Sequence, residues 1–307
     1  MKSPTYLATA AAVLFTLGLA TPTPPLAPKL PTRSSSGQLR LLHTSTPQAP
    51  SFRSSSSRIG LTAAPAEQES TKGGALLTSA ANSFTSISAT FTVPQAKVPT
   101  RGPTANQTLI HFAASFHVGI DSVSGACGSS LRAGVDIFHD GSLDDDLNDP
   151  QAWWQFSPAD PVGFANFSVA EGDLVRISVS VSEVKIENFG PLALNGTSLK
   201  CRSTNGGLGA PKQTATVSVN GTGLCGQEVG WTVEDFPLAG LPNIPVALPD
   251  FGSVRFRDVG VTGGDGEKKN ADGAVASDVR LQAQGGRLTA CGVVDGGKEV
   301  KCDRVFE

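Results

Sequence analysis

Beyond about residue 73, apolar and polar residues alternate along the chain with a period of two, and helical periodicity is hard to find. The alternation is clear over Ser83–Val93 and over Leu174–Ile186, where valines and isoleucines take turns with serines and charged residues. This pattern is typical of strands with one buried face. Shorter segments of the same kind are separated by Gly, Asn, Asp and Pro turns: Thr214–Val219, Val229–Val233, Ser253–Val261, Ala274–Leu281 and Leu288–Val294. Many short strands at this spacing predict an all-β sandwich or barrel.

The first twenty residues carry a targeting pattern. Lys2 precedes an apolar run over Tyr6–Ala20, and Gly18 and Ala20 place small residues at positions −3 and −1 of a cleavage site. This predicts a secretory signal peptide over residues 1–20, which is too short to span a membrane, and hence a secreted, extracellular protein. A single-pass anchor is the alternative, which the Pro-rich flank after Ala20 disfavours.

Charge divides the chain at about residue 72. Residues 1–72 hold seven Lys or Arg against two acids, a balance of +5, whereas residues 73–307 hold 17 against 25, a balance of −8. Residues 21–72 are rich in Pro and Ser for much of their length, so they should not fold alone. We expect a basic pro-segment there, which either docks electrostatically on the acidic domain over residues 73–307 or is merely a disordered, processed leader. The domain over residues 73–307 is acidic and the sequence contains no phosphate-binding motif, so we expect no nucleic-acid binding.

Sequons and cysteines fit an extracellular protein. The four glycosylation acceptors are Asn106, Asn166, Asn195 and Asn220. The odd number of cysteines predicts disulfides with one cysteine left over, and Cys291 and Cys302 flank a segment that resembles a hairpin, so we expect a bridge between its two ends. The cysteine spacings do not suit a zinc site and the four histidines are scattered, so we expect no metal centre and no cofactor.

Four segments, in order, resemble the glutamic peptidase (eqolisin) family. They are Phe91-Thr-Val-Pro94; Val118-Gly-Ile-Asp121 with Leu131-Arg-Ala-Gly-Val-Asp136; Ala152-Trp-Trp-Gln155 with Pro158; and Trp231-Thr-Val-Glu-Asp-Phe236 with Asp250-Phe-Gly252. The resemblance runs from about Gly73 to the C-terminus. It implies a sandwich of two long antiparallel sheets, of the concanavalin or jelly-roll kind, with a substrate cleft on the concave face of one sheet. It also implies a bridge between Cys127 and Cys225, which leaves Cys201 as the free thiol.

The family cleaves peptide bonds at acid pH with a Gln/Glu dyad. The resemblance implies that Glu234 is the general base on a water molecule and later the general acid to the leaving amine. An ordinary solvated strand carboxylate is the alternative interpretation of Glu234. Its neighbour Asp235 should point to the opposite face of the sheet. The family's Gln, which holds the water and stabilises the oxyanion, is replaced here, because its Leu-Gln-x-Gly pattern reads Leu131-Arg-Ala-Gly134.

The replacement of an amide by the guanidinium of Arg132 changes the chemistry. Arg has donors only and cannot accept a hydrogen bond from a catalytic water. Its charge should pair with Glu234 and weaken that group as a base, and its length should fill the space of the substrate carbonyl. Arg can still stabilise an oxyanion, so we expect an acid endopeptidase with impaired activity. The alternative is an inactive relative that acts as an extracellular peptide-binding or glycan-binding β-sandwich.

Further cleft residues follow from the same resemblance. The expected substrate-binding residues are Asp121, Asp136, Trp153, Gln155 and Phe236. Gln155 stands where the family usually has an acid, and His117 stands where it usually has a Trp. One hypothesis is that Gln155 supplies the missing amide while Arg132 fills the charge vacated there. We expect a monomer whose partners are a polypeptide in the cleft and its own pro-segment, with no nucleic acid and no membrane.

Overall fold

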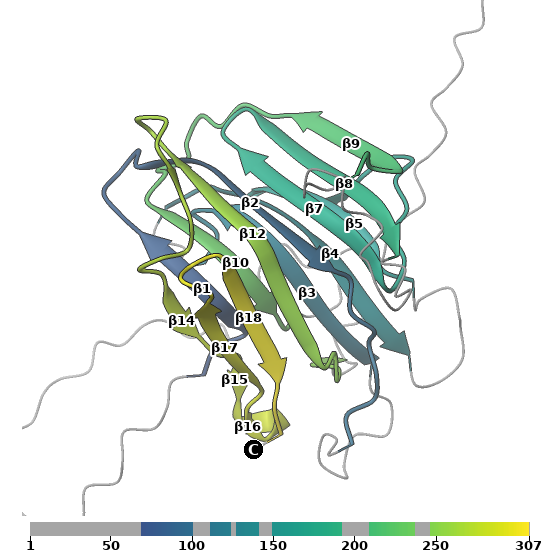
Figure 1. Ribbon diagram of the computed structural model, residues 1–307. Helices are drawn as coiled ribbons and strands as arrows, with labels where there is room; N and C mark the ends of the chain where they lie inside the picture. The colour runs from purple at the N-terminus through teal and green to yellow at the C-terminus, as the bar shows by residue number, and fades with distance from the viewer. Residues whose placement is uncertain are drawn as a thin grey trace, which may run out of the picture.

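The computed structural model describes residues 69–100, 111–123, 127–140, 149–191, 209–236 and 246–306. Nearly all of its regular elements are strands, which form two large sheets that lie one behind the other (Figure 1). The predicted sandwich is therefore confirmed. The predicted signal peptide, all but the last residues of the predicted pro-segment, Asn106, Asn195 and Cys201 lie outside the described residues.

The first sheet has eight strands in the described residues. Their order is β14 (Val275–Ser277), β1 (Lys72–Thr78), β10 (Glu228–Glu234), β3 (His111–Ile120), β4 (Ser130–Asp140), β5 (Gln151–Ser157) and β6 (Val162–Gly163), with β11 (Val246–Ala247) paired to β3. All pairs are antiparallel except the short pair of β11 with β3. Because β10 lies between β1 and β3, it joins parts of the chain that are far apart in sequence.

The second sheet also has eight strands in the part of the chain that the structure describes. Their order is β17 (Thr289–Val294), β18 (Glu299–Arg304), β12 (Ser253–Gly263), β2 (Phe84–Thr92), β7 (Asp173–Ser180), β8 (Glu183–Pro191) and β9 (Gln213–Ser218), with β13 (Lys268–Lys269) paired to β12. A separate pair, β15 (Arg280–Leu281) and β16 (Gly286–Arg287), is connected by the short 3-10 helix η2 (Gln282–Gln284).

Two of the predicted strands are interrupted. The segment Leu174–Ile186 forms the hairpin β7–β8, because the backbone N–H of Glu183 donates to Ser180 Oγ at 3.0 Å and closes a turn between them. The segment Ala274–Leu281 divides into β14 and β15. Between these strands the N–H of Val279 donates to Thr289 Oγ1 at 2.8 Å, so a side chain replaces the strand ladder there. Alternation alone did not reveal either break.

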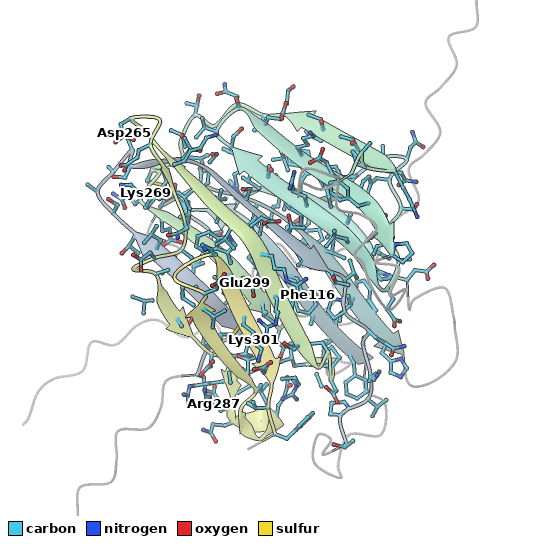
Figure 2. All side chains as sticks on the ribbon, viewed as in Figure 1. Phe116, Asp265, Lys269, Arg287, Glu299 and Lys301 are labelled. Carbon is cyan, nitrogen blue, oxygen red and sulfur yellow. A yellow bond between two sulfur atoms is a disulfide. The ribbon has the colours of Figure 1, made fainter. Side chains whose placement is uncertain are left out.

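The core lies between the sheets and takes one face of each strand. In β3 this face carries Phe116, Val118 and Ile120, none of which is exposed; Phe116 is labelled in Figure 2. In β10 it carries Val229, Trp231 and Val233, which are equally buried. Because side chains alternate along a strand, the residues between these point to the outer face of the first sheet.

Two disulfides join segments as predicted. Cys127 is bonded to Cys225, 98 residues further along the chain. Cys291 is bonded to Cys302, its direct partner in the register of β17 with β18. Across the described ranges, no helix combines the length and apolar character needed to cross a membrane.

Candidate functional site

Strand register gathers five of the predicted site residues on the outer face of the first sheet: Glu234, Arg132, Asp136, Trp153 and Gln155. Three rows run across β1, β10, β3, β4 and β5: Lys72, Glu234, Ser115, Asp136 and Gln151; Gly74, Thr232, His117, Gly134 and Trp153; Leu76, Gly230, Gly119, Arg132 and Gln155. Members of a row are direct neighbours on adjacent strands, so their side chains are close enough to interact. Residues separated by about a hundred positions therefore meet here.

Glu234 of the first row is held by two basic side chains from the other two rows. Its Oε2 accepts a hydrogen bond from Arg132 Nη1 at 2.9 Å and another from His117 Nε2 at 3.0 Å. Glu234 is 1% exposed and His117 is not exposed at all, while Arg132 is 6% exposed. The predicted pairing of Arg132 with Glu234 is confirmed. The alternative of a solvated strand carboxylate is wrong, because Glu234 is buried and paired.

Arg132 connects Glu234 to Gln155. Its Nε donates to Gln155 Oε1 at 2.6 Å, and Gln155 Nε2 donates to the carbonyl of Ala159 at 2.7 Å. The structure thus brings Gln155 to Arg132, and both ends of its carboxamide make these bonds rather than bonds to Glu234. We refer to Glu234, Arg132, His117 and Gln155 as the charge cluster.

Trp153 and Asp136 lie beside the charge cluster. The guanidinium carbon of Arg132 is 5.5 Å from the centroid of the Trp153 ring, within the range of cation–π attraction. The indole Nε1 of Trp153 donates to Asp136 Oδ1 at 2.6 Å. These two predicted residues are therefore part of the same outer face, where they support the side chain of Arg132.

Ser115 differs from its neighbours on this face. It pairs with Glu234 on one side and Asp136 on the other. Its hydroxyl is fully buried and has no hydrogen-bond partner among the described residues. A buried hydroxyl without a partner carries a desolvation cost.

Asp121 lies outside the charge cluster and organises the approach to β10. Its carboxylate accepts hydrogen bonds from four consecutive backbone N–H groups, those of residues 225 to 228, at 2.7–3.2 Å. The sulfurs of Cys127 and Cys225 lie within 4.8 Å of this carboxylate, but they are bonded to each other and so cannot serve as thiolate ligands. Asp121 thus fixes the start of β10, the strand that carries Glu234 at its other end, without touching Glu234 itself.

Phe236 also lies beyond the charge cluster. It packs against Phe138 with ring centroids 6.2 Å apart, in a small apolar group that includes Ala113. A pocket of about 300 Å³ opens in this part of the molecule, lined in part by Phe138, His139 and Glu171. None of its lining residues belongs to the charge cluster, so we do not take it as the site of chemistry.

Asp235 follows Glu234 but belongs to a different environment. Its Oδ2 accepts a hydrogen bond from Gln284 Nε2 of η2 at 2.7 Å. The pKa of Asp235 is raised to about 7, chiefly by burial and in smaller part by the neighbouring charge of Glu234, while the bond from Gln284 and the nearby Arg304 oppose the rise. Asp235 therefore contacts η2 rather than the charge cluster, in keeping with the alternation of a strand.

We did not predict the contact between His117 and Glu234. The signal that could have found it is the alternation within β3, which places His117 on the opposite face from Phe116 and Val118. The register with β10, which brings the ring beside Thr232 and Glu234, could not be obtained from the local sequence.

Comparisons with known proteins agree with this architecture. Residues 70–304 match the Peptidase A4 family. Aspergillopepsin-2 of Aspergillus niger is 27% identical over 240 residues, covering 74% of this chain and 75% of the relative. Scytalidopepsin B of Scytalidium lignicola is 28% identical over 242 residues, covering 77% of this chain and 78% of the relative.

Solved structures give the same result. Scytalido-glutamic peptidase with a peptide-based transition-state analogue superposes with a TM-score of 0.54 at 26% identity, covering 77% of this chain and 99% of that chain. SCP-B, a member of the eqolisin family in complex with the tripeptide Ala-Ile-His, superposes with a TM-score of 0.51 at 25% identity, with the same coverage.

Proposed function

The chain belongs to the Peptidase A4 family, and from this membership we propose that it is a secreted glutamic-type endopeptidase whose activity is impaired by Arg132. The observation that carries the proposal is the buried ion pair of Arg132 with Glu234, at 2.9 Å. We take Arg132 to stand where the family has its catalytic Gln. The substrate would be a polypeptide bound over the outer face of the first sheet.

The proposed reaction assigns both proton transfers to Glu234. Its carboxylate removes a proton from a water molecule while the water oxygen forms a bond to the peptide carbonyl carbon and the carbonyl π electrons move to oxygen. When the tetrahedral intermediate collapses, the C–N bond breaks and the nitrogen takes the proton back from Glu234. The products are a carboxylic acid and an amine, and Glu234 returns to its carboxylate form.

Arg132 helps one part of this reaction and hinders another. Its cationic N–H groups suit an oxyanion at the carbonyl oxygen. It cannot accept a hydrogen bond from the attacking water, and its bond to Oε2 engages an oxygen that a general base would otherwise offer to water. We therefore expect slow turnover rather than none.

One observation favours a second candidate, an inactive relative that binds peptide or glycan. Arg132 is hydrogen-bonded to both Gln155 and Glu234, and Gln155 is also bonded to a backbone carbonyl, so these side chains hold one another in place. A protein that used this face only for binding would keep such a network intact.

Cleavage of denatured casein between about pH 2 and 5 tests the proposal, with Arg132→Gln and Glu234→Gln run beside the unaltered protein. Glu234→Gln preserves the size of the side chain but cannot take up a proton. We expect weak cleavage by the unaltered protein, faster cleavage by Arg132→Gln and no cleavage by Glu234→Gln.

Silence of both the unaltered protein and Arg132→Gln, with all variants folded by circular dichroism, would overturn the proposal. Calorimetric binding of the tripeptide Ala-Ile-His, the ligand in the SCP-B structure, would then test the binding alternative directly.

A further inference from the structure

His117 is built into the charge cluster from several sides. It is not exposed to solvent, and its ring centroid lies 5.8 Å from that of Trp153. Its cross-strand neighbour on β4 is Gly134, where an added Cβ would lie 2.6 Å from His117 Cβ and 2.6 Å from the carbonyl oxygen of Phe116. The absence of a side chain at Gly134 therefore lets β4 approach the backbone and Cβ of His117 closely.

The hydrogen bond to Glu234 fixes the proton of the imidazole. An ionised carboxylate has acceptors only, so the nitrogen that faces it must be the donor. Nε2 lies 3.0 Å from Glu234 Oε2, and it therefore carries a hydrogen.

Two donors on one oxygen also orient the carboxylate. The terminal torsion of a Glu side chain is broad and roughly two-fold, so an isolated carboxylate has no single plane. The bonds from His117 Nε2 and Arg132 Nη1 converge on Oε2 and hold the carboxylate in one plane. The plane of the carboxylate, and with it the approach of a water molecule to Glu234, is thereby fixed.

We propose that His117 is a positioning residue for the hydrolysis, acting by donating its Nε2–H to Oε2 of Glu234. The inference rests on the proposed function of Glu234 as general base. It has its clearest consequence in Arg132→Gln, because the shorter side chain no longer carries the guanidinium bond, whereas the bond from His117 to that oxygen is retained.

Kinetics in the Arg132→Gln background test the proposal. Adding His117→Ala should lower kcat by about 100-fold, the cost of misplacing a reacting group by about 1 Å, with little change in KM because no contact to substrate is removed. His117→Gln should recover much of kcat, since its amide nitrogen reaches the place of Nε2. His117→Asn, whose amide nitrogen falls near the place of Nδ1, should not.

Two controls separate positioning from simple packing. His139→Gln makes the same substitution on β4 outside the charge cluster and should leave kcat unchanged. A hydrogen-bonded Nε2–H signal of His117, measured by nitrogen-15 NMR on the otherwise unaltered protein, should be present with Glu234 and lost in Glu234→Ala.

The outcomes are distinct. Equal kcat for the His117→Gln and His117→Asn double variants, or no loss in His117→Ala, would overturn the role of His117 while leaving the proposed peptidase intact. Silence of Arg132→Gln itself would overturn the proposed function, and the role of His117 in it would fall with it.

Discussion

Ion pairs occur on the outer faces of both sheets, and their surroundings differ. On the second sheet Arg255 Nη1 lies 3.0 Å from Glu299 Oε2, with the two side chains 43% and 22% exposed. On the first sheet Arg132 Nη1 lies 2.9 Å from Glu234 Oε2, with the side chains alone 8% and 1% exposed. Glu299 is labelled on β18 in Figure 2. The distances are nearly equal, so distance does not separate the two pairs; access of water does.

The difference follows from solvation. An exposed pair gains little, because water screens the attraction and already solvates both partners. A buried pair is not necessarily stabilising as a whole, but the loss of one partner leaves a charge without compensation. The charge cluster should therefore be sensitive to single substitutions and tolerant of a matched double substitution.

Loss of Glu234 should have the largest effect. We expect Glu234→Ala to lower the free energy of unfolding by about 3–5 kcal/mol, because Arg132 stays buried without its anion. Glu299→Ala, the matched change on the second sheet, should cost about 1 kcal/mol or less. Urea denaturation monitored by circular dichroism measures both.

The double variant Arg132→Gln/Glu234→Gln removes both charges and leaves a neutral, hydrogen-bonding amide at each position. It should recover most of the stability lost in Glu234→Ala. Equal costs for Glu234→Ala and Glu299→Ala would contradict the comparison.

The second-largest change in stability should come from pH, through the titration of Asp235. Burial raises its pKa in the folded protein from 3.8 to about 7. Between about pH 4 and pH 7 the folded protein then holds a proton that the unfolded chain has lost, so stability falls as pH rises through this window and levels off above it. With about 1.4 kcal/mol for each pKa unit, the loss is at most about 4 kcal/mol.

Asp235→Asn should remove this part of the pH dependence, since Asn has no proton to lose. Tm measured from pH 4 to pH 8 would reveal the change. Asp303→Asn on the second sheet is the matched control. Desolvation there is outweighed by hydrogen bonds from Lys301 and Ser253, and the pKa of Asp303 is lowered instead. A falling Tm that persists in Asp235→Asn would assign the effect to another group.

Ser115 should give the smallest effect, with the opposite sign. Its buried hydroxyl has no partner among the described residues. Ser115→Ala should therefore raise the free energy of unfolding by about 1 kcal/mol. Ser178→Ala, on the half-buried outer face of β7, should change it by less than about 0.5 kcal/mol. Destabilisation by Ser115→Ala in urea titrations would mean that the hydroxyl is satisfied.

Sequence patterning predicted the sandwich because most strands bury one face, which imposes a period of two on the residues. It missed the turn after Ser180 and the break near Val279, where hydrogen bonds to side chains interrupt the ladder. Such bonds depend on individual atoms and leave the hydrophobic pattern nearly unchanged.

The candidate site was predictable in part. Arg132 and Glu234 carry opposite charges and stand at the two dyad positions of the family's motifs, which was enough to predict the bond between them. The contact of His117 with Glu234, and the four bonds that Asp121 accepts, depend on how β10 aligns with β3 and on the backbone that leads into β10. Register is a property of the paired strands, so neither strand alone contains it.

The place of β10 between β1 and β3 also affects how the protein is made. Glu234 lies 102 residues after Arg132, so a growing chain completes β3 and β4 long before the strand that neutralises their basic residues is synthesised. Until then β1 and β3 lack a shared neighbour, and their open edges can pair with other chains. Topologies dominated by such long-range contacts fold in milliseconds to seconds. Assembly of the charge cluster should therefore be a late event in folding, with aggregation as the competing outcome at each earlier stage.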